Sequence, residues 1–452
     1  MKLNRAIRPQ SKAARQFDLP PIESFELING LKVFYSPKPK LPIVKLNLMI
    51  PAGSRFDAYG QEGLAYLTSL LIDEGAGKYN ALQLANEIDK LGSSIDVSTS
   101  VDYIFLSLTS LTENFERTLE LFSLILKEPL FDQESFEREK AKHITKILQS
   151  FDDASYIAAN AFQRNIFKGT PYDKPILGFS KSVESFDLTL VKDFYSCFFH
   201  SPFSNLIAVG AVEKSALSNL LNKYLGDFQF KNATSMININ RGKGKAKLYF
   251  VNKEGAAQSE IIAGHLIKNR NEDDYLAAKV ANSILGGQFS SRINLNLRED
   301  KGYTYGAHSL LSYNKQLGYF NINTSVQSEF TRNSINEIRK EVNLIRENIT
   351  DEEITFAKSS LVRQFPSYFE TYSQLVQRIT TKVTHELDDY DETYIQNIWD
   401  LTHEEIQSAA IEYFRPDELC FFVVGDKEII YRDLQQINDL ELIELDKLGN
   451  QL

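Results

Sequence analysis

Apolar and polar positions along the first half of the chain predict strands and helices in a definite order. The runs Leu31–Phe34 and Ile43–Ile50 are apolar and flanked by turn residues, which predicts two strands. In Gly63–Glu74 the leucines fall on one stripe at helical spacing. Ile95–Leu111 then predicts a pair of strands. Two long helices are expected next, over Glu113–Lys127 and Gln133–Ser150.

The second half repeats this order. Its predicted strands, helix, strand pair and long helices are Lys247–Phe250, Ser259–Leu266, Asp274–Leu285, Thr304–Thr324, Thr331–Glu347 and Asp351–Gln364. Each half then has a helical stretch, opened by Asp187 or Asp400 within Asp-Leu-Thr and stopped before Pro202 or Pro416. A strand closing on Val-Gly follows in both, and the two copies lie about 213–215 positions apart. The agreement in order and spacing predicts an internal duplication.

Grouped strands and helices of this kind predict an α+β fold rather than a strictly alternating one. A chain of 452 residues is also too long for a single ordinary core. We expect two homologous domains, each a mainly antiparallel sheet packed against helices. The expected divisions are a basic tail over 1–18, a first domain over 19–228, a polar linker over 229–246 and a second domain over 247–452.

Composition narrows the class of protein. A net charge of −10 makes general nucleic-acid binding unfavourable, because phosphates repel an acidic chain. No apolar run reaches the roughly 18 residues that a membrane span needs. Cys197 and Cys420 are the only cysteines, which leaves no disulfide framework or thiolate metal cluster. We therefore expect a cytoplasmic protein.

The first 17 residues are an exception, with five basic side chains and no acidic one. Such a stretch is either a targeting segment or a solvated tail. Pro9 would break a helix early, which favours the solvated tail.

Sequence motifs exclude several kinds of catalytic site. No two of the six histidines stand four residues apart, so no helix offers a histidine pair to a metal. His385-Glu386 and His403-Glu404 resemble half of such a motif, and both are more typical of surface helices. The chain also has no Gly-x-Ser-x-Gly elbow and no phosphate loop ending in Gly-Lys-Ser/Thr.

One polar cluster stands out around Gly302. Arg298 lies in a predicted helix end for which Gly302 is the C-cap, and Tyr303 and Tyr305 follow in a predicted strand. Alternation in that strand places both tyrosines on one face. Together with Arg292 they could hold a peptide carboxylate or carbonyl. The ordinary interpretation is an arginine at a helix C-terminus beside half-buried tyrosines.

Nearly the whole chain resembles the pitrilysin/insulinase family of zinc metallopeptidases. Asn29-Gly30-Leu31-Lys32-Val33 and Ala52-Gly53-Ser54-Arg55 match the family's opening strands and turns. The family then has Gly-Leu-Ala-His-x-x-Glu-His on a helix, where this chain reads Gly63-Leu64-Ala65-Tyr66-Leu67-Thr68-Ser69-Leu70. The first three residues of the motif are kept, and the metal-binding residues are replaced.

The resemblance implies that the zinc site is lost. Tyr66 and Leu70 stand at the two histidine ligand positions, and Ser69 stands at the general-base glutamate. The third ligand falls seven residues after Glu139, on Lys146. Tyr66 is a poor ligand at neutral pH, Leu70 has no donor atom and Lys146 adds positive charge, so we expect no metal here.

The family's second-half motif is retained. Leu285-Gly286-Gly287-x-x-Ser290-Ser291-Arg292, then Leu297-Arg298-Glu299-x-x-Gly302-x-x-Tyr305, is similar to it throughout. In active members this arginine and tyrosine reach from the other half of a clam-shell chamber towards the substrate on zinc. The resemblance implies that Arg298 orients peptide backbone and that Tyr305 donates a hydrogen bond to the developing oxyanion.

Two functions are compatible with this pattern. In the first, the chain is the non-catalytic subunit of a heterodimeric zinc endopeptidase, forms half of the clam-shell and is inactive alone. Its expected partners are a homologous subunit with an intact zinc motif, which holds the zinc, and peptide substrates. In the second, it is a structural pseudo-peptidase in a larger assembly, which gives no reason to keep Arg298 and Tyr305.

Overall fold

The fold is built on two six-stranded sheets, one in each half of the chain. The computed structural model describes residues 17–229 and 244–452, so most of the predicted basic tail and of the predicted linker lies outside the described residues. The first sheet has the strand order β1-β2-β8-β3-β7-β6. Its strands are β1 Glu23–Glu26, β2 Lys32–Pro37, β3 Ile43–Ile50, β6 Ser94–Thr99, β7 Ile104–Leu111 and β8 Asn205–Gly210.

The second sheet has the order β11-β12-β10-β13-β9-β14, which read backwards repeats the first in all strands but the edge strand β14, since β14 pairs parallel with β9 whereas β1 pairs antiparallel with β2. Its strands are β9 Lys247–Asn252, β10 Gln258–Ile267, β11 Thr304–Tyr313, β12 Gly318–Gln327, β13 Cys420–Gly425 and β14 Glu441–Leu445. In both sheets most neighbours are antiparallel, and β2 with β8 corresponds to the parallel pair of β9 with β13. The predicted α+β fold with two mainly antiparallel sheets is therefore confirmed, and so is its internal repeat.

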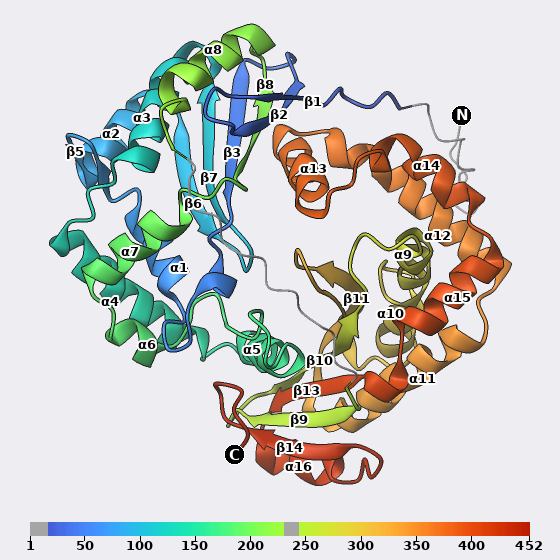
Figure 1. Ribbon diagram of the computed structural model, residues 1–452. Coiled ribbons are helices and arrows are strands. Elements are labelled where there is room, and N and C mark those ends of the chain that lie inside the picture. Colours follow the sequence, from blue (N-terminus) through green and yellow to red (C-terminus); the bar gives the residue numbers. More distant parts are fainter. Residues whose placement is uncertain (1–16, 230–243) are drawn as a thin grey trace, which may run out of the picture.

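Helices of the first half form an outer layer over one face of the first sheet (Figure 1). Leu46 and Leu106 of the sheet share a buried core with Leu67 of α1 and Phe122 of α3. A short hairpin of β4 (Gly75–Ala76) and β5 (Tyr79–Asn80) follows α1. The helices are α1 Leu64–Leu71, α2 Ala81–Lys90, α3 Phe115–Lys127, α4 Gln133–Ser150, α5 Ala154–Ile166, α6 Ser180–Glu184, α7 Leu188–Phe198 and α8 Lys214–Leu225.

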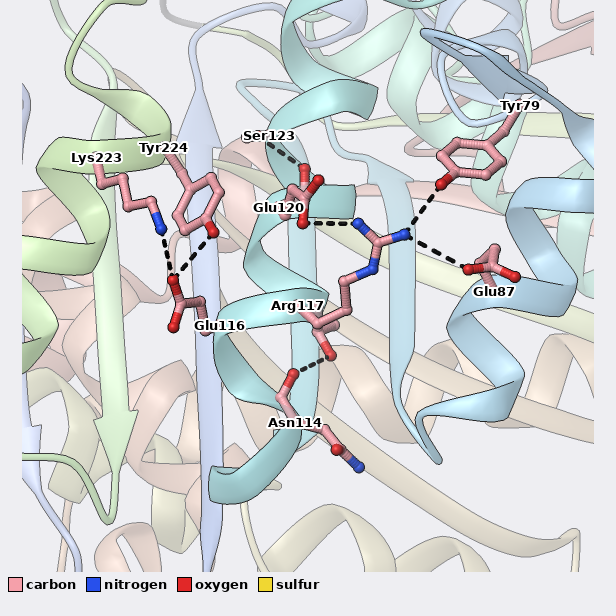
Figure 2. Close-up of polar contacts among 10 residues, drawn as sticks. Tyr79, Glu87, Asn114, Glu116, Arg117, Glu120, Ser123, Lys223 and Tyr224 are labelled. Carbon is pink, nitrogen blue, oxygen red and sulfur yellow. Dashed lines mark hydrogen bonds and ion pairs between the residues drawn. The ribbon is translucent and has the colours of Figure 1, made fainter.

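Polar contacts near the surface connect the helices of this outer layer (Figure 2). Arg117 of α3 donates to the hydroxyl of Tyr79 at 3.0 Å and pairs with Glu87 of α2 at 3.5 Å. On the other side of α3, Glu116 pairs with Lys223 of α8 at 2.7 Å. These contacts lie near the surface, where water and salt screen ion pairs, so they stabilise the layer only weakly.

The second half has the equivalent helical layer. Two of its helices, α12 and α15, begin at a capping box: Thr350 and Thr402 each accept from the backbone N–H three residues on, and Glu353 and Glu405 close the boxes. The helices are α9 Tyr275–Leu285, α10 Arg292–Asn294, α11 Thr331–Glu347, α12 Asp351–Gln364, α13 Tyr372–His385, α14 Tyr390–Asp400, α15 His403–Tyr413 and α16 Lys427–Leu434.

The two halves exchange one helix each. α5 of the first half packs on β10 and β13 of the second sheet, and α13 of the second half packs on β3 and β8 of the first (Figure 1). Under α5, Phe162 lies over Gly264, where a Cβ atom would come within 2.8 Å of the ring. Ile207 and Met49 of the first sheet belong to the same buried core as Leu375 of α13. Neither half therefore buries both faces of its sheet alone.

No helix within residues 17–229 and 244–452 is long and apolar enough to cross a membrane.

Candidate functional site

The helix at the expected zinc position, α1, is fixed at its start by a buried carboxylate. Asp57 accepts hydrogen bonds from the backbone N–H groups of Gly63 and Ala65, both at 2.8 Å. Gly63 has a positive φ of 101° and lies against the carbonyl of Leu177, which would be 2.7 Å from an added Cβ. The glycine of the family-like segment is thus required by the backbone conformation and the close approach of a neighbouring loop.

Tyr66 of α1 and Lys146 of α4 meet directly. The Lys146 ammonium donates to the Tyr66 hydroxyl at 2.6 Å and also lies over the ring, 5.1 Å from its centre. The imidazole of His143, one turn earlier on α4, packs against the same ring at 4.7 Å. Burial lowers the pKa of His143 to about 4, so this histidine is neutral at pH 7. The positions aligned with two ligands are therefore adjacent in space and joined by a charge-assisted hydrogen bond.

The other two replaced positions carry no metal-binding group either. The hydroxyl of Ser69 donates to the backbone carbonyl of Tyr66 at 2.7 Å and accepts from Thr99 of β6 at 2.7 Å. Leu70 is half-buried and has no donor atom. In the described part of the chain no three His, Cys, Asp or Glu side chains are grouped so that they could hold a metal ion. Zinc does not fit this set, because the cationic Lys146 offers no lone pair and would repel the ion.

Arg138, the residue before Glu139, links α4 to the end of α1. Its guanidinium pairs with Glu74, just after α1, and with Glu139 at 3.1 Å. Lys142 pairs with Glu139 at 2.7 Å. This network joins α4 to the end of α1 and so holds Lys146 beside Tyr66.

The second-half motif begins at the end of α9, passes through α10 and continues as a π-helical turn over Leu295–Asp300. π-Helical turns are rare and frequently occur at functional sites. Gly302 follows with a φ of +68°, and the N–H of Tyr303 returns to the carbonyl of Leu297 at 2.9 Å. The predicted glycine at the helix end is confirmed, and the turn delivers the chain directly into β11.

Tyr303 and Tyr305 do not share a face, so that prediction is wrong. Tyr303 precedes the strand and stacks on Phe330, with ring centres 4.4 Å apart. A β-bulge interrupts the register of β11 between Thr304 and Ala307. The Thr304 hydroxyl closes this bulge by donating to the carbonyl of Gly306 at 2.9 Å and accepting from its N–H at 3.0 Å. The extra residue re-aims Tyr305, whose side chain is 91% exposed.

The two arginines of the motif also separate. Arg292 is held inside the second half, where it pairs with Glu353 of α12 at 2.6 Å and donates to the carbonyl of Asn348 at 3.0 Å. Burial raises the pKa of Glu353, but hydrogen bonds led by that from Arg292 outweigh this effect and lower it to about 2. Arg292 and Tyr303 therefore stabilise the fold, in agreement with the ordinary interpretation of the cluster.

Arg298 remains at the surface of the π-helical turn, which packs against β11. Its guanidinium lies over the ring of Phe289 at 4.5 Å, and its nearest carboxylate is the neighbouring Glu299 at 3.5 Å. Phe289 is 67% exposed. Sequence analysis missed Phe289, although it lies inside the Gly286–Arg292 motif. Arg298 and Phe289 thus form a partly exposed pair that precedes β11, the strand that carries Tyr305.

Each half of the chain matches the model of a protein family. Residues 32–179 match the model of the insulinase family, peptidase family M16, and residues 185–361 match that of the peptidase M16 inactive domain. The chain therefore belongs to the M16, or insulinase, family of peptidases and carries an inactive-type M16 domain.

Individual relatives differ in what they are described to be. The chain is 24% identical to an uncharacterized zinc protease of Rickettsia felis, over 74% of this chain and 81% of the relative. It is 23% identical to the non-peptidase homolog YmxG of Helicobacter pylori, over 89% and 94% of the two chains. It is also 24% identical to subunit 1 of the mitochondrial cytochrome b-c1 complex of Caenorhabditis elegans, over 82% of each.

Solved structures agree on the fold. A peptidase M16 inactive domain from Pseudomonas fluorescens superposes with a TM-score of 0.84 at 22% identity, over 90% of this chain and 98% of that one. A protease from Helicobacter pylori superposes with a TM-score of 0.81 at 19% identity, over 90% and 100%. The arrangement of the sheets and helices is thus that of M16 proteins.

Proposed function

We propose that this chain is the zinc-less subunit of a heterodimeric zinc endopeptidase of the M16 family. The observation that carries the proposal is the contrast between its two motifs. In the first half, two of the positions aligned with zinc ligands hold Lys146 and Tyr66, which are hydrogen-bonded to each other. In the second half, Tyr305 is almost fully exposed, and Arg298, whose side chain is 36% exposed, lies over Phe289 and pairs with the adjacent Glu299. Because Tyr305 and Arg298 contribute little to the stability of the fold, their polar groups are available to a substrate.

The partner subunit supplies the zinc and the general base in this proposal. Arg298 presents a planar fork of donors that orients a peptide carbonyl or carboxylate. Tyr305 donates a hydrogen bond to the oxygen on which negative charge develops when water attacks the peptide bond. The bulge closed by Thr304 fixes the direction of Tyr305, which matters because an oxyanion donor works only in a fixed position.

Relatives support an assignment to proteolysis without activity of this chain alone. The Rickettsia felis relative is described as a zinc protease and the Helicobacter pylori relative as a non-peptidase homolog. A split of labour between two M16 chains accommodates both descriptions.

The test is hydrolysis of a quenched fluorescent peptide library by three samples: this chain, an M16 chain with an intact zinc motif from the same genome, and their mixture. We expect cleavage by the mixture that neither chain gives alone, and its loss on chelation of zinc. Cleavage by this chain alone would contradict the proposal.

A structural role is the second candidate, and the similarity to a cytochrome b-c1 complex subunit favours it. A stable complex with an M16 partner that cleaves no peptide would support this scaffold function instead.

A further inference from the structure

A buried asparagine lies between the two parts of the second-half motif. Asn294 ends the short helix α10, immediately before the π-helical turn, and is only 4% exposed. Its Nδ2 atom donates to the backbone carbonyl of Phe289 at 2.6 Å, and its Oδ1 atom accepts from the backbone N–H of Ala307 at 3.0 Å. One side-chain amide therefore bridges the loop before α10 and the strand β11.

The bond to Ala307 satisfies a backbone group that the sheet leaves unpaired. β11 is an edge strand of the second sheet, so N–H groups on its outer side have no neighbouring strand. Ala307 is only 4% exposed, and its bond to Asn294 is buried. A buried N–H without an acceptor is unfavourable, so the Asn294 amide stabilises this position of the strand.

The β-bulge that contains Tyr305 is thus held from both sides. On the inner side, the hydroxyl of Thr324 in β12 donates to the carbonyl of Gly306 at 3.1 Å. On the outer side, the Asn294 amide binds Ala307 and lies so close that a Cβ atom on Gly306 would be 3.8 Å from its Oδ1 atom. Tyr305 directly precedes Gly306, so its backbone is fixed while its side chain stays exposed.

The other end of the amide anchors the arginine. The Arg298 guanidinium lies over the ring of Phe289 at 4.5 Å, and this ring is itself largely exposed. A ring exposed to this extent is held only weakly by packing. The bond from Asn294 to the Phe289 carbonyl joins the backbone of this loop to β11. Tyr305 and the Phe289–Arg298 pair therefore share one buried anchor.

We propose that Asn294 is a positioning residue, which fixes Tyr305 relative to the Phe289–Arg298 pair so that both act on one peptide. The inference rests on the proposed function and adds the residue that coordinates its two substrate contacts. An arginine that orients a peptide and a tyrosine that stabilises its oxyanion act together only at a fixed separation, because a small misplacement of such groups lowers the rate strongly.

The test is the kcat of the two-chain mixture with Asn294→Asp. At about pH 8 the new carboxylate still accepts from Ala307 but cannot donate to the carbonyl of Phe289. We expect kcat to fall about tenfold relative to the unaltered pair, the worth of about one hydrogen bond, with a smaller change in KM. At about pH 6 this ratio should recover, because burial and the facing carbonyl favour the neutral acid, which donates again. Asn294→Ala has no donor at any pH and should show no recovery.

Asn29→Asp is the matched control in the first half. The amide of Asn29 donates to the backbone carbonyls of Leu225 and Phe228, at 2.9 and 2.8 Å. It also accepts from the N–H of Leu31 at 3.2 Å. This variant should lose stability in a similar pH-dependent way and leave kcat unchanged. An asparagine that only stabilised the fold would make Asn294→Asp behave like this control.

Hydrogen exchange of this chain alone gives a second readout, which needs no peptidase activity. Loss of the shared anchor should loosen both of its partners at once. We expect Asn294→Ala to raise amide exchange at least about tenfold in residues 287–291 and 304–308 together, and Asn29→Asp to leave both segments unchanged.

An unchanged kcat in Asn294→Asp, a loss that does not recover at lower pH, or faster exchange in fewer than both segments would overturn the proposal. Its failure is distinguishable from that of the proposed function. No cleavage by the unaltered mixture rejects the peptidase function, and the exchange measurement then still decides whether Asn294 couples the two segments.

Discussion

Removal of the Asp102 carboxylate should weaken the contact between the two halves of the chain. Asp102 lies between β6 and β7 and forms an ion pair with Arg55 in which both side chains are only 8% exposed. It also accepts from the hydroxyl of Tyr172 at 3.0 Å and from the backbone N–H of Lys315 at 2.8 Å. Because Lys315 belongs to the β11–β12 turn, one carboxylate joins residues of both halves.

The size of the effect follows from what Asp102→Ala leaves behind. Breaking a buried ion pair by removing one partner costs about 3–5 kcal/mol, because the remaining charge is uncompensated. The hydroxyl of Tyr172 and the N–H of Lys315 lose an acceptor too, at about 1–3 kcal/mol each, and these costs are not additive. We therefore expect Asp102→Ala to lower the free energy of unfolding by at least about 3 kcal/mol.

Urea unfolding followed by circular dichroism and by fluorescence measures this effect. Trp399 on α14 is the only tryptophan, so fluorescence reports on the second half. Both signals should shift together to lower urea concentration. Asp193→Ala at an exposed position is the control, with an expected change within about 0.5 kcal/mol. A loss below about 1 kcal/mol in Asp102→Ala would refute the assigned strength of this contact.

Three further predictions concern the second half. Thr304→Val removes the hydroxyl that closes the bulge and should lower kcat of the two-chain peptidase about tenfold with little change in KM, because Tyr305 loses its direction; steady-state kinetics measure this. Burial lowers the pKa of Lys279 from 10.5 to about 7, so the unfolded chain binds more protons between these values and stability rises with pH there. Lys279→Met should accordingly raise the melting temperature most at about pH 6 and progressively less towards pH 10, and an equal gain at both would contradict this. The pKa of Glu353 is lowered from 4.5 to about 2, so its contribution to stability is present above pH 4.5 and lost as the pH falls towards 2; in Arg292→Ala, acid melting curves should lose this component.

Sequence patterns predicted the strands and helices whose conformation depends mainly on neighbouring residues. The strands at 31–34 and 43–50 and the helix at 63–74 were predicted within a few residues, because alternation, helical spacing and glycine turns are encoded nearby. The π-helical turn before Gly302 was predicted only as a helix end. The zinc-site positions could be aligned because Gly63 and Ala65 preserve the frame around Tyr66.

Features that depend on distant contacts could not be predicted. The exchange of α5 and α13 is one of them, since an apolar helix face does not specify which sheet it covers. The bulge in β11 is another, because one extra residue interrupts simple alternation between Thr304 and Ala307, where Tyr305 lies. The pocket between the first sheet and α13 is a third, because Ser107 and Thr381, which both line it, come from different halves of the chain.

The most direct test of the central claim is the rate of peptide cleavage by the two-chain mixture when Tyr305 is replaced by Phe. Tyr305→Phe removes one hydroxyl from an exposed ring and should leave the fold and the complex unchanged. Tyr59→Phe, the same change at another fully exposed tyrosine, is the matched control. We expect Tyr305→Phe to lower kcat about 100-fold, the usual loss for one oxyanion donor, and Tyr59→Phe to have no effect. A kcat for Tyr305→Phe equal to that of the unaltered pair would contradict the role given to this chain.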